Sequence, residues 1–313
     1  MIASPDPIAV VCMSGGKDST ATALVAIEQY GRERVRLVMA DTGHEHPLTM
    51  AYVQDYLPGA LDLPVKIVRA DFAKDFARKR AYIADKWLGK GVDAATVARA
   101  LSLLHPTGIP FLDLCMWKGR FPSRKAQFCT ELLKRNPLDQ HMIALAKIGP
   151  VESWQGVRRN ESLNRRNALP RERSDWGWDI VRPIVDWTAA DTFACMARHG
   201  VKPNPLYSLG MKRVGCMPCI NCGKDELLEI SKRFPAEIAR VAEWEQLVAG
   251  CSKLGLASLL FNEAFGGSNK EFAAANPIGQ LVAWAHTSHG GKQFDMGRLM
   301  SVTECSSVYG LCE

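Results

Sequence analysis

The N-terminal part of the chain alternates between two patterns of apolar and polar positions. Short apolar runs at 8–13, 34–40 and 63–68 are typical of strands buried on both faces of a sheet. The stretches between them, at about 18–30 and 47–56, fit helices, and Pro47 suits the first turn of the second. Strands that alternate with helices predict an α/β fold with an open, mostly parallel sheet and helices on both faces.

The sheet pattern returns further along the chain, at 151–157 and 179–184. Thr188, with Asp191 three residues later, resembles a capping box and predicts a helix that ends near His199. These elements extend the predicted sheet beyond its first three strands.

Other segments give helices or loops. Residues 71–104 are helical and basic in pattern, whereas 108–122 have recurring Gly and Pro without periodicity and predict a loop. Residues 226–248 predict helix interrupted at Pro235, and the tail from Phe265 gives no clear secondary structure. We therefore expect an α/β domain over 1–225 and a helical, irregular C-terminal extension over 226–313.

Composition changes this picture only a little. The 313 residues contain 47% hydrophobic and 23% charged residues, which argues against wholesale disorder. The net charge of +6 suits an anionic partner such as a nucleotide or nucleic acid. No apolar run approaches the length of a membrane-spanning helix, and the N-terminus lacks the basic start of a signal peptide. We expect a cytoplasmic protein without a membrane partner.

The segment Ser14-Gly15-Gly16-Lys17-Asp18-Ser19 lies between the first predicted strand and helix. Open parallel sheets bind ligands at the carboxyl ends of their strands. Glycines let the backbone approach a phosphate, and the helix behind them presents N–H groups and a positive dipole end. Lys17 adds a positive charge, and the serines add hydroxyl donors. The alternative is a plain tight turn with a helix cap, but the whole hexapeptide in this context favours a phosphate site.

This segment lacks the spacing of the Walker loop and resembles the PP-loop of the adenine nucleotide alpha hydrolases. Within that superfamily the chain resembles the phosphoadenosine phosphosulfate (PAPS) reductase family. The resemblance extends in order over about residues 8–225 and includes further segments: Asp41-Thr42-Gly43 with Pro47, Phe128-Cys129-Thr130 with Lys134 and Pro137, 156–162, 183–187, Asn204-Pro205-Leu206-Tyr207, and Gly215-Cys216-Met217-Pro218-Cys219.

The resemblance implies an enzyme that binds an adenine nucleotide. Reductases that act on PAPS have a degraded PP-loop, whereas this loop is intact, as in members that adenylate a substrate with ATP. We therefore expect ATP, with Mg²⁺, and release of pyrophosphate coupled to sulfur transfer. Lys17 would stabilise the leaving pyrophosphate. The nucleotide-binding residues are then Ser14, Gly15, Gly16, Lys17, Asp18, Ser19, Asp41 and Thr42.

Arginines follow the predicted strand at 151–157. Guanidinium groups bind phosphate or sulfate bidentately, although a charge run is often a solvated loop, here with Glu161 as partner. In the resembling family the Arg-Arg-x-x-Ser arginines face the sulfate or phosphate of the nucleotide. This implies an anion-binding role for Arg158, Arg159 and Arg165.

Three of the ten cysteines, Cys216, Cys219 and Cys222, follow one another with two residues between each and the next. This is the spacing of thiolate ligands to zinc or to an iron–sulfur cluster, and packing alone rarely produces it. The resemblance implies a 4Fe-4S cluster, because some members of the family carry one, with zinc as the alternative. The family's upstream cysteine pair is reduced here to Cys129, so the fourth ligand is open between Cys222, Cys305 and Cys312.

The C-terminal Cys312 follows Gly310-Leu311, whereas PAPS reductases have a nucleophilic cysteine before Gly-Leu. Cys312 is a candidate catalytic thiol, a cluster ligand or an inert end. Two rival functions remain open: a sulfonucleotide (PAPS or adenosine phosphosulfate) reductase that releases sulfite, and a non-catalytic zinc protein that binds nucleotides or nucleic acid.

Two further groups lie near these motifs. His44 and His46 follow Asp41 and are interpreted as polar surface rather than a metal pair. A basic strip, containing Trp117 and Phe121 as stacking groups, would extend the anion-binding surface and could contact a nucleic acid substrate. The strip consists of Lys118, Arg120, Arg124, Lys125, Lys134 and Arg135. A sulfur donor protein is the other partner that we expect.

Overall fold

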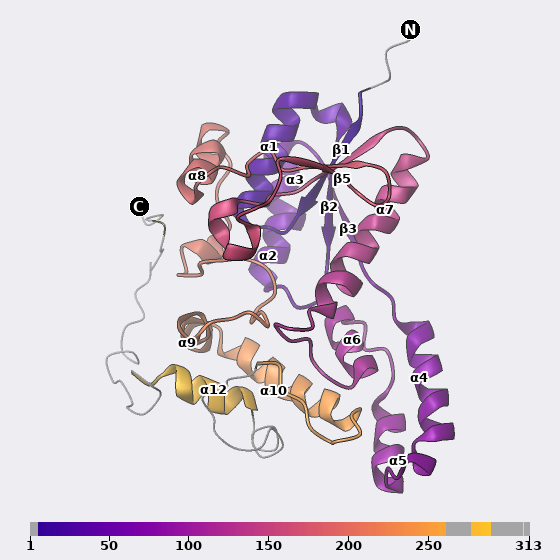
Figure 1. Ribbon diagram of the computed structural model, residues 1–313. Coiled ribbons are helices and arrows are strands. Elements are labelled where there is room, and N and C mark those ends of the chain that lie inside the picture. Colours follow the sequence, from indigo (N-terminus) through magenta and orange to yellow (C-terminus); the bar gives the residue numbers. More distant parts are fainter. Residues whose placement is uncertain (1–5, 261–276, 289–308, 310–313) are drawn as a thin grey trace.

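A computed structural model describes residues 6–260, 277–288 and 309 of the chain. Their core is one six-stranded sheet with the order β3-β2-β1-β4-β6-β5 (Figure 1). Five strands are parallel, and β5 pairs antiparallel with β6 at one edge. The strands are β1 (Ile8–Met13), β2 (Val35–Ala40), β3 (Val65–Val68), β4 (Val151–Trp154), β5 (Arg171–Arg173) and β6 (Asp179–Val181). The predicted α/β fold with a mostly parallel sheet is confirmed.

The sheet is covered on both faces because successive side chains of a buried strand point in opposite directions. Ala9, Val11 and Met13 of β1 pack with α1 (Lys17–Tyr30), α3 (Leu57–Leu61) and α8 (Ala189–Arg198). Ile8 and Val10 pack against α7 (Asn136–Ala146) on the opposite face. Figure 1 shows α7 and α8 on opposite sides of the strands.

Several local predictions are confirmed. The N-terminus of α8 is a capping box in which Thr188 Oγ1 accepts from Asp191 N at 3.2 Å and Asp191 Oδ2 accepts from Thr188 N at 2.7 Å. The predicted helix from Pro47 exists as α2 (Pro47–Ala51), followed by a π-helical turn over Tyr52–Tyr56 and then α3. The basic region after β3 is two helices, α4 (Ala73–Lys86) and α5 (Ala94–Leu103), the second capped by Asp93.

The predicted loop at 108–122 is wrong, because it contains α6 (Pro110–Lys118). Residues 110–116 are all buried, so the helix has no polar face and no amphipathic period for the sequence to show. Pro110 stands at its first turn and Gly119 ends it in a left-handed conformation, so these residues mark helix boundaries here. The sequence pattern also missed β5 and α7. Helix α7 follows a π-helical turn over Thr130–Arg135.

The described helices of the C-terminal extension are α9 (Lys224–Arg233), α10 (Pro235–Gly250) and α12 (Pro277–Ala285). The break at Pro235 is as predicted, whereas α12 lies in a tail for which no secondary structure was expected. All three helices pack in one apolar cluster with α4, α5 and α6, below the sheet in Figure 1. The domain boundary near residue 225 stays a prediction.

The remaining described helical segments are short 3₁₀ turns: η1 (Arg32–Arg34), η3 (Leu88–Lys90), η5 (Arg159–Glu161), η6 (Leu163–Arg165) and η7 (Pro205–Tyr207). Within the described residues, none of the helices has the length and apolar character needed to span a membrane.

Candidate nucleotide site and cysteine loop

The loop Ser14–Ser19 joins the carboxyl end of β1 to the first turn of α1. Gly15 has φ +72°, and a Cβ there would lie 2.8 Å from Thr49 Cγ2, so the turn requires glycine. Ser19 Oγ donates to Gly16 O at 3.0 Å and accepts from Ser14 N at 3.2 Å. The loop is thus a closed turn at a helix N-terminus, which is the geometry that binds phosphate in parallel sheets.

Lys17 makes contacts through both its side chain and its backbone. Its Nζ lies 3.4 Å from Asp18 Oδ2, and its backbone N–H donates to the Tyr207 hydroxyl at 3.0 Å. The same Nζ lies 5.3 Å and 5.1 Å from the ring centroids of Tyr207 and Tyr309, within the range of cation–π attraction. The ammonium group is buried with only 5% of the residue exposed, so its position is fixed before any ligand binds.

The segment Asn204–Tyr207 completes this loop from a distant part of the sequence. Asn204 Nδ2 donates to Gly15 O at 3.1 Å, and Tyr207 accepts from Lys17 N as described. Burial raises the pKa of Tyr207, so its hydroxyl stays protonated. In the sequence these residues carry the family resemblance and show no other role. Their role in the loop was missed because nothing in a sequence shows contacts across about 190 positions.

The segment after β4 packs directly on the loop. A Cβ at Gly156 would lie 2.7 Å from the carbonyl carbon and oxygen of Asp18 and 2.8 Å from Ser19 N. Arg158, which is buried, donates from Nε to Asp18 Oδ1 and from Nη1 to Asn160 Oδ1. The backbone of this segment and the guanidinium of Arg158 therefore fix the first turn of α1.

The other two predicted anion-binding arginines have protein partners. Arg159 pairs with Asp186 and donates to Ala168 O at 3.0 Å. Arg165 pairs with Glu161, which is the partner expected for a solvated charge run. The structure therefore brings Arg158 alone of the three to a contact with the loop, and an anion-binding role for Arg158, Arg159 and Arg165 stays a prediction.

Asp41 and Thr42 follow β2, the strand next to β1. Asp41 is buried and accepts from Arg69 Nε at 2.7 Å and from Gly43 N at 2.8 Å. Thr42 donates to the carboxylate of Glu45 at 2.8 Å. Both residues lie at the expected edge of the sheet, but their described partners are protein groups. Their contact with a nucleotide or magnesium ion stays a prediction.

The histidines after Asp41 are not polar surface, and that interpretation is wrong. His44 is 1% exposed, stacks on Phe111 with 4.4 Å between ring centroids, and lies 2.9 Å from Pro218 O. Burial and the nearby Arg240 lower its pKa to about 3, so it is neutral. His46 Nδ1 accepts from Leu48 N and caps α2. The apolar partners come from distant helices, which the local pattern around 44–46 does not show.

The cysteine loop pairs with this same segment. Met217 N donates to His44 O at 2.9 Å, and Cys216 forms an isolated antiparallel bridge with Glu45. Cys216 Sγ lies 3.6 Å from Thr42 Oγ1 and 3.7 Å from a carboxylate oxygen of Glu45. Residues 41–46 therefore connect the predicted nucleotide edge of the sheet to the cysteine loop.

Lys134 is a cation of the cysteine region, together with Arg213. The thiol groups of Cys216, Cys219 and Cys129, together with Glu45, raise its pKa. Burial raises the pKa of Cys216 to about 12, and the ammonium of Lys134 opposes that rise. The sequence pattern suggests that Lys134 belongs to a basic strip, whereas in the structure three of the four predicted ligands act on its charge.

Cys222, the fourth predicted ligand, has different neighbours. Its Sγ donates to Gly223 O at 3.5 Å, and burial and Glu226 raise its pKa while Arg213 lowers it. Across residues 6–260, 277–288 and 309, no three Cys, His, Asp or Glu side chains are arranged to hold one metal ion. The described thiols thus do not fit a four-thiolate centre as they stand. The metal-ligand role of Cys129, Cys216, Cys219 and Cys222 stays a prediction, and Cys305 and Cys312 lie outside the described residues.

Comparison with known proteins agrees with these motifs. The family model "Phosphoadenosine phosphosulfate reductase domain" matches residues 113–222, which include the arginine segment and the cysteine loop. Residues 113–222 of the chain therefore belong to a PAPS reductase-family domain. That family is part of the PP-loop superfamily, as the sequence resemblance implied.

The relatives differ in how much of the chain they match. A protein of Escherichia phage 186, named "Uncharacterized 37.8 kDa protein in gpa 5'region", is 46% identical over 98% of this chain and 97% of its own length. An adenosine 5'-phosphosulfate reductase of Burkholderia cepacia is 32% identical over 37% of this chain and 41% of its own length. A crystal structure of a PAPS reductase from Candida auris in complex with phosphate covers 68% of this chain and 82% of that chain, with TM-score 0.42 and 18% identity.

Proposed function

We propose that this PAPS reductase-family protein binds ATP at the loop Ser14–Ser19 and cleaves it between the α and β phosphates to adenylate a substrate, in chemistry coupled to sulfur transfer. The observation that carries the proposal is the preformed loop with the buried Lys17 at the N-terminus of α1. An intact loop of this kind suits a nucleotide with a pyrophosphate group, which ATP has and PAPS lacks.

The residues of the loop have separate tasks in this proposal. Backbone N–H groups at the start of α1 bind phosphate oxygens, and Lys17 stabilises the negative charge that develops on the leaving pyrophosphate. Asp18 and Arg158 neutralise each other and keep Lys17 in place. Mg²⁺ would share the phosphate charge when bound with ATP. Tyr207 and Asn204 hold the loop from behind.

The products of ATP test this proposal. ATP labelled on the α-phosphate is incubated with the protein, Mg²⁺ and a deproteinised bacterial extract as a source of acceptors. Wild-type protein is expected to release pyrophosphate and to transfer the labelled AMP group to an acceptor, from which a sulfur nucleophile or water displaces it as AMP. Lys17→Ala is expected to lower the rate of this transfer by about a hundredfold. Lys147→Ala, at the exposed residue that follows the end of α7, is the matched control. Formation of ADP, or an unchanged rate in Lys17→Ala, would contradict the proposal.

The sulfur-transfer part of the proposal rests on the cysteine loop, which pairs with residues 44 and 45 and brings Cys216 Sγ to 3.6 Å from Thr42 Oγ1. Iron, zinc and sulfide analysis of protein purified without oxygen tests which centre they form. A 4Fe-4S cluster predicts iron and sulfide in equal amounts, lost in Cys219→Ala and retained in Cys251→Ala, at a cysteine buried elsewhere. Zinc without sulfide would instead favour the non-catalytic, nucleic-acid-binding alternative. No step of the ATP reaction proposed above depends on this centre.

A sulfonucleotide reductase is the second candidate, because several relatives are named adenosine 5'-phosphosulfate reductase. Release of sulfite from adenosine phosphosulfate or PAPS, in the presence of a thiol reductant, would support it. Loss of that release in Cys312→Ser, with ATP binding retained, would assign the reductive step to the C-terminal thiol. The absence of sulfite with both nucleotides would exclude this candidate.

A further inference from the structure

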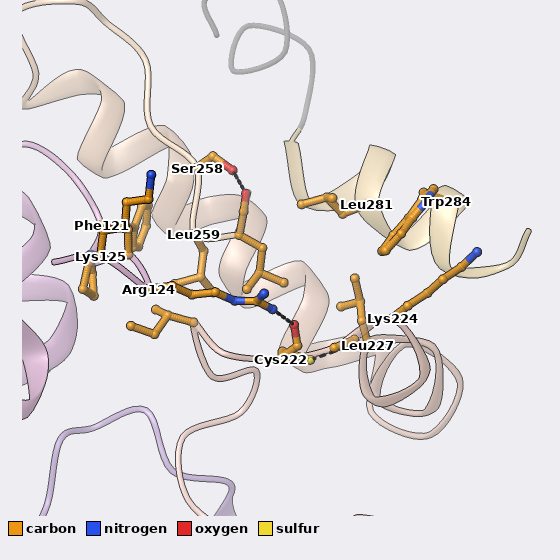
Figure 2. Close-up of a pocket in the computed structure, with 15 residues that line it drawn as sticks. Phe121, Arg124, Lys125, Cys222, Lys224, Leu227, Ser258, Leu259, Leu281 and Trp284 are labelled. Atoms are coloured by element: carbon orange, nitrogen blue, oxygen red, sulfur yellow. Dashed lines mark hydrogen bonds between the residues drawn. The ribbon is translucent and has the colours of Figure 1, made fainter. Parts of the chain in front are cut away.

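A cavity lies away from the nucleotide loop, where three parts of the chain meet (Figure 2). Its walls come from the segment after α6, from the end of the cysteine loop with the start of α9, and from α12 with residues 258–260. Its volume of about 610 Å³ is in the usual range for sites that bind small organic ligands. None of its lining residues belongs to the nucleotide loop or the arginine segment.

The inner walls of the cavity are apolar. Phe121 and Leu227 are buried in the large helical cluster, and Leu281 and Trp284 contribute from α12. In Figure 2, Leu281 and Trp284 project from one side and Phe121 lies on the other. These side chains suit a ligand with an apolar or aromatic body.

The polar lining is cationic. Arg124, Lys125 and Lys224 line the cavity, and its described lining contains neither Asp nor Glu. Arg124 is exposed, and its Nη2 makes a long contact of 3.4 Å to Cys222 O. Lys224 Nζ donates to Thr287 Oγ1 at 3.1 Å and lies 4.7 Å from the ring centroid of Trp284. Three cations, with no Asp or Glu among the described lining residues, favour an anion over a cation or a neutral ligand.

We propose that this cavity binds a small organic phosphate, with an apolar or aromatic body against Phe121, Leu281 and Trp284 and its phosphate on Arg124 and Lys125. A nucleoside monophosphate has this chemistry. Arg124 can exchange its weak contact with a carbonyl for a bidentate contact with phosphate, which is the stronger interaction. The site is separate from the ATP site and does not depend on the proposed reaction.

The shape of the site favours a small ligand over a nucleic acid strand. The cavity is bordered by three chain segments, and two other cations of the basic strip interact elsewhere: Lys118 lies 3.9 Å from the ring centroid of Trp117, and the cysteine thiols raise the pKa of Lys134. A strand would need a continuous track of cations instead. Cys222 lines the cavity, so a bound ligand is expected to shield that thiol.

Equilibrium dialysis with labelled AMP tests the site. Wild-type protein is expected to bind AMP in the cavity, and Lys17→Ala to retain this binding. Arg124→Glu is expected to weaken it by at least about tenfold, which corresponds to ~1.4 kcal/mol. Arg135→Ala, at an exposed cation of the same strip outside the cavity, is the matched control. Arg124 is exposed, so its replacement leaves the fold intact; Trp284→Phe, which keeps an aromatic side chain, checks the apolar wall.

The outcomes separate this site from the ATP site. Loss of all AMP binding in Lys17→Ala with no effect of Arg124→Glu would overturn the proposed cavity site and leave the ATP site standing. Adenosine that binds as tightly as AMP would overturn the role of the phosphate. Binding of an oligonucleotide but not of AMP, sensitive to Arg124→Glu, would overturn the small-ligand assignment. Protection of Cys222 from alkylation by AMP, detected by peptide mass spectrometry, would support it.

Discussion

The nucleotide loop and the cysteine loop differ in how completely the folded chain assembles them. In the nucleotide loop, the turn, the lysine and their supporting groups from Gly156, Asn204 and Tyr207 are joined by direct contacts. In the cysteine loop, Cys216 lies beside Thr42 and Glu45, whereas Cys222 is turned toward Gly223 and Glu226. The first region is therefore fixed by direct contacts around a helix N-terminus, whereas two of the thiols in the second region have different neighbours.

The comparison shows what each kind of site requires. A phosphate site of this type is made by backbone geometry, which folding alone fixes. Thiolate sites are completed by the ion that they bind, because unbound thiols avoid becoming buried anions. Burial raises the pKa of Cys216 to about 12, in line with this reasoning. The two regions share residues 41–46, so a change at one is expected to reach the other.

The largest effect is expected from Gly156→Ala, which tests whether the nucleotide loop is preorganised by packing. The new Cβ would meet the backbone of Asp18 and Ser19, which cannot move without shifting the start of α1. We expect a loss of about 1–3 kcal/mol in stability from overpacking. A shift of this size in the loop is expected to weaken ATP binding by about a hundredfold.

Thermal unfolding and equilibrium binding of ATP measure these two effects. Gly149→Ala is the control, because a Cβ at Gly149 has nothing within 4 Å. If Gly156→Ala binds ATP as tightly as the wild-type protein, the close approach of the segment after β4 does not shape the loop.

Substitution of Glu245 tests how the C-terminal extension, which supports the cysteine loop, is held in place. Its carboxylate accepts from Leu259 N at 2.9 Å and from Ile278 N at 3.1 Å, and burial raises its pKa to about 7. Protonation therefore stabilises the fold: this contribution is full below the unfolded pKa near 4.5 and is lost as pH rises through about 7.

We expect Glu245→Gln to flatten the pH dependence of unfolding between pH 4.5 and 8, with a relative gain at pH 8 on the order of 2 kcal/mol. Urea unfolding at a series of pH values measures it, with Glu131→Gln as the exposed control. An identical pH profile in both proteins would exclude this role for Glu245.

A smaller effect is expected from Tyr207→Phe, which removes the partner of Lys17 N–H without changing the ring. A buried donor left unpaired costs about 1–3 kcal/mol, so ATP affinity is expected to fall by about tenfold. Isothermal titration measures the affinity, and Tyr82→Phe, at an exposed tyrosine, is the control. An affinity equal to wild type would mean that Lys17 is positioned without Tyr207.

The smallest effect is expected from Arg240→Ala. Arg240 Nη2 donates to Met217 O at 3.1 Å and lies 3.3 Å from His44 Nδ1, so it ties α10 to the cysteine loop. Its loss is expected to let the loop open more often and to raise the alkylation rate of Cys216 by about fivefold. Iodoacetamide labelling followed by peptide mapping measures this, with Arg78→Ala as the exposed control. An unchanged rate would show that the loop does not depend on α10.

The sequence was sufficient for the parts of the molecule that depend on local pattern. Buried strands such as 8–13, the turn Ser14–Ser19 and the capping box at Thr188 each have a signature within a few residues. Helix α6 escaped prediction because a helix buried on every side has no period to detect.

The missed parts of the candidate site depend on contacts between distant segments. Tyr207 on Lys17, Gly156 on Asp18, and Phe111 beside His44 join segments that lie far apart in the sequence. Lys134 showed the same difficulty, since its place in a run of basic residues suggested a surface charge. Charge runs report composition, whereas the partner of each charge is decided by packing.

The proposed function requires that the loop Ser14–Ser19 recognises a pyrophosphate group through Lys17. Competition binding of ATP against adenosine 5'-phosphosulfate, in wild-type protein and in Lys17→Ala, tests it most directly. Wild-type protein is expected to bind ATP about tenfold or more tightly than adenosine 5'-phosphosulfate, and this preference is expected to disappear in Lys17→Ala. Tighter binding of adenosine 5'-phosphosulfate, or an ATP preference that persists without the lysine, would contradict it.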